Sequence, residues 1–481
     1  MSQHRVLRAF SSIHHPPIHC LGNGGCSVWA LLALRSFTST LAVPGRTEWP
    51  PAAALNGILP PWLSLPDGED ILKQFDLSET QLNQQQTVQI VNIPGYANWT
   101  ETGWNVRLHG AAYRDPPLTT QQLNEAAKPF VPGLDYDTMN DSMKLQARNL
   151  TGGIVTVPTD GVYISFDFVY NRNSIATVSY PGPTDGWGEY DAFVQVAVAD
   201  GIVPTGNVTI NTQGVELFNN VSISGNASTY LVPTQGITLV SDVDDILRVT
   251  KIWNPQEGLQ NTFVYPFQPW MSMSGKPSVC RSCRDEPMGR NDSQPTLPLT
   301  TTPIKVARPY MSFIYGNYPL GSFDVRPLNF TTLDQTFSIR KVNLQRVLET
   351  FPYRKFVLLA DTSNWDVMKQ YPAMAKEFPG RVQCILIRNV TATDTSDYFP
   401  YDTSGFKDLD NSTYMFFRTP DDIAGLNFAN GDCRNSSVPQ NVTFAWQGVE
   451  NLLNAAPANT VPSGHNLVAL LGLFLGVTIL F

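Results

Sequence analysis

The chain has 481 residues, of which 42% are hydrophobic and 11% aromatic. This length suffices for two or three domains, and this composition supports packed cores, which excludes a mainly disordered chain. With 32 basic and 41 acidic residues the formal net charge is −9, which excludes the broad basic surface typical of nucleic-acid binding.

The first 47 residues contain no Asp or Glu and include an apolar segment over residues 28–34. This pattern is typical of a targeting leader, either a secretory signal with a long basic region or an acid-poor organellar presequence. Asn-x-Ser/Thr acceptor sequences, which suit a lumenal or extracellular surface, favour the secretory route. They occur at Asn98, Asn140, Asn149, Asn207, Asn220, Asn226, Asn291, Asn329, Asn389, Asn411, Asn435 and Asn441.

Residues 451–481 have the pattern of a lipid-anchor signal. Small residues at 454–456 precede a polar spacer and an apolar tail over residues 467–481, and this order is typical of a glycolipid attachment signal. An uncleaved tail anchor is the alternative, although the tail is shorter than the roughly 17 residues that span a bilayer. We therefore expect the protein at the extracellular face of the plasma membrane or in the cell wall, with an organellar location as the alternative.

Few cysteines are present. Cys280 and Cys283 have the spacing of half a zinc site, but no second Cys or His pair accompanies them, so a local disulfide or two free thiols is favoured over metal binding. Cys384 lies in an apolar, strand-like run and Cys433 in a turn. A disulfide between these two would be compatible with secretion.

In chain order, residues 48–83 are expected to form a linker, because the composition up to about residue 67 is rich in Pro, Ala and Leu. A β-rich domain is expected over residues 84–233, with one helix at residues 120–130. Strands separated by Gly, Pro and Asn turns predict a mainly antiparallel sandwich or barrel. The expected strands are residues 87–93, 104–109, 153–157, 162–170, 175–180, 191–198, 207–211 and 214–221.

Residues 234–450 are expected to form a second, α/β domain with an atypical insert at residues 273–297. Strand and helix patterns alternate here, which indicates a parallel sheet covered by helices on both faces. Right-handed crossovers then place the carboxyl ends of several strands along one edge. The expected strands are residues 237–241, 298–301, 355–360, 382–387 and 413–418, and the expected helices are residues 304–315, 336–350 and 365–378.

Carboxylates follow two of these strands. Asp242 and Asp244 end the first, and Asp361 and Asp366 lie in the loop after the third. Bare carboxylates at a buried strand end are unfavourable unless a cation binds there, and oxygen ligands favour Mg²⁺. We therefore expect these four aspartates to hold Mg²⁺, with Asp242 as the nucleophile that becomes an aspartyl-phosphate. Asp244 would donate a proton to the leaving oxygen and later accept one from water.

Phosphate-binding groups are expected at two further positions. Thr300 ends the second strand of the domain, followed by Thr301 and Thr302, and its hydroxyl would bind the transferring oxygens. Lys341, on the helix after it, would neutralise them, with the adjacent Arg340 as the alternative cation.

These residues occur in the order of the four motifs of the haloacid dehalogenase superfamily. More closely, residues 239–245, 318–321, 326–328, 351–358 and 361–363 resemble the catalytic domain of the actin-patch phosphatidate phosphatase family. Residues 103–110 resemble the β-rich region upstream of that domain, so the similarity covers about residues 88–448. The resemblance implies a dehalogenase-like Rossmannoid fold and Mg²⁺-dependent hydrolysis of phosphatidate to diacylglycerol and phosphate. It also implies a phospholipid substrate met at a membrane surface.

Ile246 departs from this pattern, because the superfamily's first motif normally has a threonine there. The sequence leaves open whether the lost hydroxyl lowers the rate, and loss of activity is not expected because the nucleophile, acid and metal ligands remain. Two alternative functions stay open: a phosphatase for small soluble phosphate esters, and a cell-surface binding or wall protein whose catalytic domain has decayed. The sequence does not indicate the oligomeric state.

Overall fold

The computed structural model describes residues 67–170, 173–197, 208–217, 221–271, 296–304, 307–319, 321–326, 333–394, 401–440 and 442–447. All of them belong to one compact unit that begins at Asn56. The leader, the anchor-signal region and the insert through residue 295 lie outside the described residues, as do the acceptor sites at Asn207, Asn220, Asn291, Asn329 and Asn441. Within the described ranges, no helix has the length and apolar character needed to cross a membrane.

Two short helices correct the predicted linker. They are α2 (Gly68–Gln74) and α3 (Glu79–Gln85), and each begins with a capping box. The Asp67 carboxylate accepts the Asp70 N–H at 2.8 Å, which satisfies a donor that the first turn of a helix otherwise leaves unpaired. Ile71 of α2 and Leu82 of α3 are buried in one small apolar cluster. The linker prediction extended a composition bias that ends near residue 67 and overlooked these caps.

The β-rich region confirms the expected, mainly antiparallel architecture. Its described strands join in one sheet with the order β1-β3-β2-β9-β8-β5-β6, and β4 and β7 also pair with β3. Among these pairs only β2 and β9 run parallel. The strands are β1 (Gln89–Ile93), β2 (Gly95–Thr100), β3 (Gly103–Arg114), β4 (Val157–Pro158), β5 (Tyr163–Tyr170), β6 (Asn173–Pro183), β7 (Glu189–Val196), β8 (Val208–Leu217) and β9 (Val221–Val232).

This sheet curls, so that β6 and β7 approach each other. The rings of Tyr180 and Tyr190 lie 5.4 Å apart, and the Asp191 N–H donates to the Tyr180 hydroxyl at 3.1 Å. Side chains such as Val106 and Phe168 fill one buried cluster inside the curl. Curling therefore lets a single sheet enclose a core of its own.

Helices α4 (Thr120–Ala127) and α5 (Asp141–Ile154) lie within the β-rich part of the chain. Helix α4 confirms the expected helix, whereas α5 covers the start of a strand predicted at residues 153–157. The buried residues Ala147, Leu150 and Ile154 recur at helical spacing on one face of α5. They pack against α6 (Pro255–Phe263), so tertiary burial decides the conformation here.

The second half of the chain confirms the α/β domain. Its sheet has the order β12-β11-β10-β13-β14-β16, and every described pair in it is parallel. The strands are β10 (Gly236–Asp242), β11 (Thr296–Pro303), β12 (Asp324–Arg326), β13 (Arg354–Asp361), β14 (Val382–Arg388) and β16 (Tyr414–Phe417). The helices are α8 (Ala307–Asn317), α9 (Leu333–Thr350) and α10 (Trp365–Glu377). Strand β15 (Tyr401–Asp402) pairs with β17 (Trp446–Gln447) in a separate antiparallel sheet of two strands.

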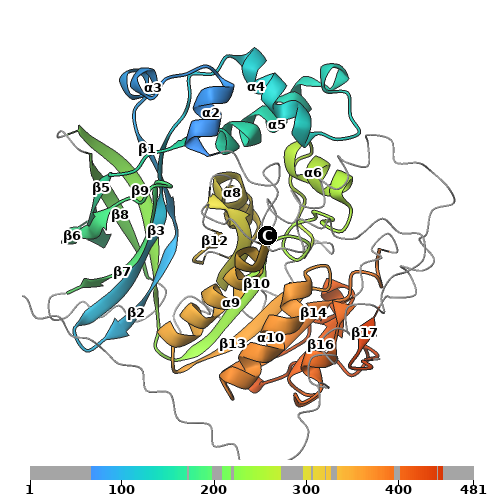
Figure 1. Ribbon diagram of the computed structural model, residues 1–481. Coiled ribbons are helices and arrows are strands. Elements are labelled where there is room, and N and C mark those ends of the chain that lie inside the picture. Colours follow the sequence, from blue (N-terminus) through green and yellow to red (C-terminus); the bar gives the residue numbers. More distant parts are fainter. Residues whose placement is uncertain are drawn as a thin grey trace, which may run out of the picture. The chain divides into compact units, whose positions relative to one another are not determined.

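Helices cover both faces of this sheet (Figure 1). Alternate residues of β13 point to opposite faces: Phe356 and Leu358 pack with α9 and α10, and Val357 and Leu359 pack in the cluster that includes α8. Strand β10 lies between β11 and β13. Its carboxyl end therefore lies inside the sheet, with neighbours on both sides to position a reacting group.

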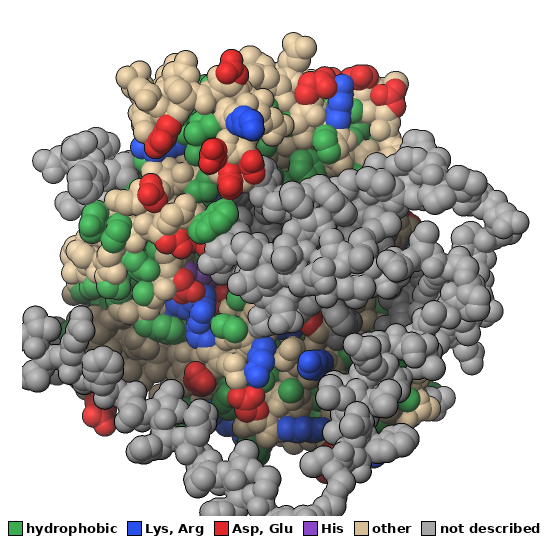
Figure 2. All heavy atoms as spheres, in the orientation of Figure 1, with side chains coloured by type: hydrophobic (Ala, Val, Ile, Leu, Met, Phe, Trp, Pro, Cys, Tyr) green, Lys and Arg blue, Asp and Glu red, His purple; other side chains and the backbone are tan. Residues whose placement is uncertain are grey.

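An ion-pair network joins the two sheets. Arg107 of β3, which is only 2% exposed, pairs with Asp324 of β12 at 2.9 Å and with Asp191 of β7 at 2.8 Å. Arg346 of α9 also reaches Asp191, at 2.9 Å. On the face in Figure 2, Asp and Glu side chains are numerous over the uppermost helices. Within the network the Arg107–Asp324 pair is buried, and leaving one of these two charges unpaired would be costly.

Candidate active site

The site is built on the carboxyl end of β10. Asp242 is the last residue of that strand, 3% exposed, and it pairs in register with Leu299 of β11. Asp244 follows two residues later and is also buried. Thr300 is the residue after Leu299, so its backbone lies beside the end of β10, as its predicted role requires. Its side chain is outside the described structure.

Arg340 is the cation that reaches Asp242. This residue of α9 is 3% exposed, and its Nη1 donates to Asp242 Oδ1 while its Nε donates to Asp366 Oδ2 at 2.8 Å. Lys341, which the sequence analysis preferred, is half-buried, and among the described ion pairs none joins it to the four aspartates. The structure therefore brings the alternative residue, Arg340, into the site.

Asn364 holds two of the carboxylates together. Its Nδ2 lies 3.0 Å from Asp361 Oδ2 and 3.4 Å from Asp242 Oδ2. Ser363 donates its backbone N–H to Asp361 Oδ1 at 2.8 Å. The loop after β13 thus fixes Asp361 by its own polar groups and places it beside Asp242. Sequence reasoning missed Asn364, because a single Asn in a loop carries no distinctive signal.

Asp244 is oriented by two residues from its own loop. Its Oδ1 accepts from Arg248 Nη1 at 3.1 Å and from the Thr250 hydroxyl at 2.6 Å. Arg248 in turn lies over the rings of Phe267 and Tyr310, at 4.1 and 4.7 Å. The other oxygen, Oδ2, is buried and has no hydrogen-bond partner among the described residues. One oxygen of Asp244 is therefore fixed while the other stays available for proton transfer.

Asp245 shapes the loop that carries these groups. Its φ of 59° is the left-handed conformation that Asp tolerates better than most residues. Its carboxylate accepts the backbone N–H groups of Thr250, Lys251 and Ile252 at 2.8–3.0 Å. The chain is thereby folded back so that Arg248 and Thr250 can reach Asp244. This role was not anticipated, because the pattern of hydrogen bonds appears only in the folded loop.

Burial dominates the electrostatics of the site. It raises the pKa of Asp242 to about 8, although Arg340 opposes the effect. Burial likewise raises the pKa of Asp244 and of Asp361, each to about 6. Arg340 pairs with Asp242 and Arg248 pairs with Asp244, while the positive charge of Arg388 opposes the rise in the pKa of Asp361. The site is consequently favourable for a further cation.

The donor set fits a magnesium ion. Asp242 and Asp361 present oxygens to the same amide nitrogen, and Asp366 Oδ1 is buried without a hydrogen-bond partner among the described residues. In the described parts of the chain, no group of three or more His, Cys, Asp or Glu side chains is arranged to hold a metal. Magnesium, however, usually takes one or two carboxylates and keeps several waters. The pair Asp242 and Asp361 meets that smaller requirement.

Ile246 is fully buried in the apolar cluster that includes Leu239 and Tyr310. Its side chain is therefore part of the hydrophobic core. A hydroxyl there would need a partner within that apolar cluster, so the departure from the superfamily pattern has a packing explanation in this chain.

A disulfide joins Cys384 of β14 to Cys433, with the Cα atoms 5.3 Å apart. Both residues are buried. Separations of this size are ordinary for disulfides. The bridge that the sequence left open is therefore present in the structure, where it ties the loop after residue 430 to the sheet.

The comparisons with known proteins converge on one family. Residues 237–389 match the family described as phosphatidate phosphatase APP1, catalytic domain. The chain is also 25% identical over 240 residues to Phosphatidate phosphatase APP1 of Saccharomyces cerevisiae, a match that covers 49% of this chain and 39% of that relative. The chain thus matches well under half the length of the relative. The matched segment contains the strand-end aspartates Asp242, Asp244 and Asp361, so the candidate site lies within the part of the chain that is similar to the phosphatidate phosphatase APP1 catalytic domain.

Proposed function

We propose that the protein is a Mg²⁺-dependent phosphatidate phosphatase that releases phosphate and diacylglycerol through an aspartyl-phosphate on Asp242. One observation carries this proposal. Asp242 is buried at the carboxyl end of a central strand with N–H donors from Arg340 and Asn364 at its two oxygens, inside the segment that matches the family.

The geometry supports a two-step displacement. An Asp242 oxygen forms a bond to phosphorus, and the bond from phosphorus to the glycerol oxygen breaks. Asp244 gives its proton to that leaving oxygen and then accepts a proton from the water that hydrolyses the aspartyl-phosphate. Arg248 and Thr250 hold Asp244 through Oδ1 alone, which leaves Oδ2 to exchange the proton.

Repulsion between the attacking carboxylate and the phosphate must be offset. Arg340 supplies one positive charge at Asp242 and would bind the transferring oxygens in place of Lys341. Thr300, whose backbone follows Leu299 beside the end of β10, would contribute its hydroxyl for the same purpose. Asp242 and Asp361 would hold Mg²⁺, with Asp244 and Asp366 completing its surroundings, and the bound ion would neutralise charge on the phosphoryl group.

A secretory location accompanies the proposal. The disulfide between Cys384 and Cys433 suits an oxidising compartment. The acceptor residues Asn140, Asn149 and Asn411 are exposed, as attachment of a bulky glycan requires. A lipid anchor would then place the site at a membrane surface, where a phospholipid substrate is available.

A substrate panel tests the function. The full chain is assayed for phosphate release from phosphatidate, glycerol 3-phosphate and p-nitrophenyl phosphate, with Mg²⁺ and with chelator. We expect release from phosphatidate that requires Mg²⁺ and disappears in Asp242→Asn. Release from the two soluble esters alone would favour the soluble-ester alternative, and no metal-dependent release from any ester would defeat the enzyme proposal.

A further inference from the structure

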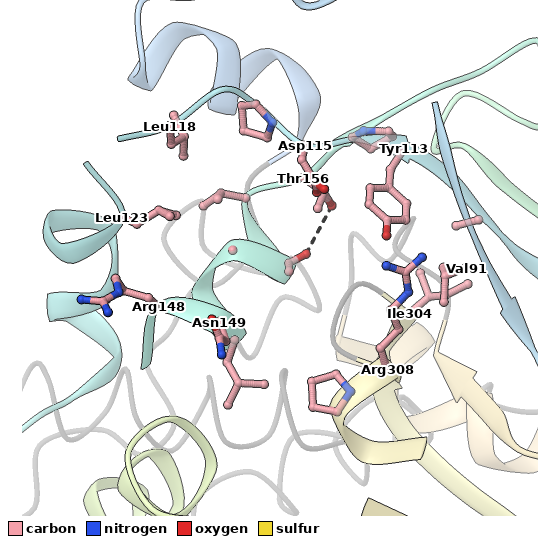
Figure 3. A pocket seen from close by; sticks show the side chains of 18 of the residues that line it. Val91, Tyr113, Asp115, Leu118, Leu123, Arg148, Asn149, Thr156, Ile304 and Arg308 are labelled. Atoms are coloured by element: carbon pink, nitrogen blue, oxygen red, sulfur yellow. Dashed lines mark hydrogen bonds between the residues drawn. The ribbon is translucent and has the colours of Figure 1, made fainter. Parts of the chain in front are cut away.

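A pocket of about 410 Å³ lies away from the four aspartates. It is bounded by α4 and α5 on one side, by β1 and β3 on another, and by the residues that lead into α8 (Figure 3). Most of its wall is apolar, including Val91, Leu118, Leu123, Leu150 and Ile304. Its volume falls in the range of about 300–1,000 Å³ that is typical of small-molecule sites.

The pocket adjoins the catalytic edge of the parallel sheet. Ile304 lies just beyond β11 and only four residues after Thr300, so the two Cα atoms are separated by about 14 Å at most. Helix α8 supplies both a wall of the pocket, at Arg308, and the ring of Tyr310. That ring lies 4.7 Å from the guanidinium of Arg248, which pairs with Asp244. A single helix therefore connects the pocket to the proton donor.

The polar groups of the pocket are few and mostly fixed. Arg308 lies 5.3 Å from the Tyr113 ring centroid and donates to the Ile90 carbonyl at 3.0 Å. Arg148 lines the wall contributed by α5, and Asp115 accepts from Gln89. Arg148 donates to Asn124 at 3.2 Å, so the two guanidinium groups already have partners and the apolar wall is the surface left for a ligand to contact.

We propose that this pocket receives an acyl chain of the phosphate-ester substrate while the phosphate lies at Asp242. The inference rests on the proposed phosphatase function and adds to it a preference for chain length. A small soluble ester would leave the pocket unfilled and would gain nothing from its apolar wall.

Two glycines provide a matched test. Gly152 lines the pocket, whereas Gly316 lies on α8 and is not among its lining residues. Each lies within a helix, and among the described residues a Cβ added at either position meets no atom within 4 Å outside its own helix backbone and chain neighbours. Gly152→Leu and Gly316→Leu thus have similar backbone effects. Only the leucine at residue 152 would extend into the pocket.

The measurement is kcat/KM of the full chain on dihexanoyl, dioctanoyl and didecanoyl phosphatidate and on glycerol 3-phosphate. Each methylene buried is worth about fourfold in binding. If the new leucine displaces about two methylenes of the chain, Gly152→Leu should lower kcat/KM on the didecanoyl ester by roughly 15-fold. Glycerol 3-phosphate should be unaffected, and Gly316→Leu should match the unaltered protein. Leu123→Ala, which enlarges the pocket, should shift the preference towards longer chains.

An equal loss by Gly152→Leu on all four substrates, or no loss on any, would overturn the inference. Calorimetric titration with didecanoyl phosphatidate separates this result from failure of the proposed function. Binding that Gly152→Leu weakens, without phosphate release by the unaltered chain, would leave the acyl site standing and defeat the phosphatase. Phosphate release that does not depend on chain length would support the phosphatase and defeat the acyl site.

Discussion

Arg340 and Lys341 are neighbours on α9, and replacing each with Gln distinguishes their roles. Arg340 contacts both Asp242 and Asp366. Lys341 is half-buried, and within the described structure it makes no ion pair with the site aspartates. Both substitutions remove one positive charge from the same turn of the same helix. Differences between the two variants therefore report contacts at the site rather than net charge.

The expected magnitudes follow from burial. Loss of a preorganised donor at a reacting group typically lowers kcat by about 10² to 10³, and we expect a loss of this size for Arg340→Gln. Removal of one partner from a buried ion pair also costs about 3–5 kcal/mol of stability. For Lys341→Gln we expect kcat within about threefold of the unaltered chain and a stability change within about 0.5 kcal/mol, as for ordinary surface substitutions.

Phosphate release gives kcat for the two variants, and denaturant unfolding in chelator gives their stability. Unfolding is repeated with Mg²⁺, which should recover part of the stability lost in Arg340→Gln, because the ion compensates the buried carboxylate charge that the substitution leaves unpaired. A large loss of kcat in Lys341→Gln together with a small one in Arg340→Gln would refute this reasoning and restore Lys341 as the phosphate-binding cation.

Three further outcomes are expected. Replacing Cys384 and Cys433 by Ala should lower stability by about 4 kcal/mol for a 49-residue separation, measured by denaturant unfolding; an unchanged midpoint would contradict a closed disulfide. Burial lowers the pKa of His109 to about 3, so unfolding takes up a proton below pH 6.5. Between pH 6.5 and pH 4.5 this proton uptake should lower the stability of the unaltered chain by about 2.3 kcal/mol, and His109→Asn should abolish that loss; equal pH profiles for the two chains would contradict it. Ile246→Thr should destabilise by about 1–3 kcal/mol without raising kcat; a faster variant would show that Ile246 limits the rate.

The periodicity of the chain was enough to predict the parallel sheet and its helices. The strand predicted at residues 355–360 is β13 (Arg354–Asp361), and the helix predicted at residues 365–378 is α10 (Trp365–Glu377). Both are strongly patterned elements buried on a defined face. Helix α5 was not predicted, because its apolar face becomes evident only when α6, over a hundred residues away in the chain, covers it.

The strand-end aspartates were predicted for a similar reason. Parallel strands bring their carboxyl ends to one edge, so Asp242 and Asp361 had to be neighbours once the sheet was recognised. The choice between Arg340 and Lys341 depends on the rotation of α9 about its axis. That rotation is set by packing of residues such as Leu344 and Val347. Asn364 and Asp245 act through loop conformation, which local sequence patterns specify weakly.

Trapping the phosphoryl group on the protein tests the central claim most directly. Asp244→Asn is reacted with p-nitrophenyl phosphate, whose leaving group needs no proton, so the first step proceeds while hydrolysis lacks its base. Borohydride then reduces an aspartyl-phosphate to homoserine, which mass spectrometry locates in the chain. We predict homoserine at residue 242 and none in the variant that also carries Asp242→Asn. Phosphate released without homoserine at residue 242, or with homoserine elsewhere, would contradict nucleophilic attack by Asp242.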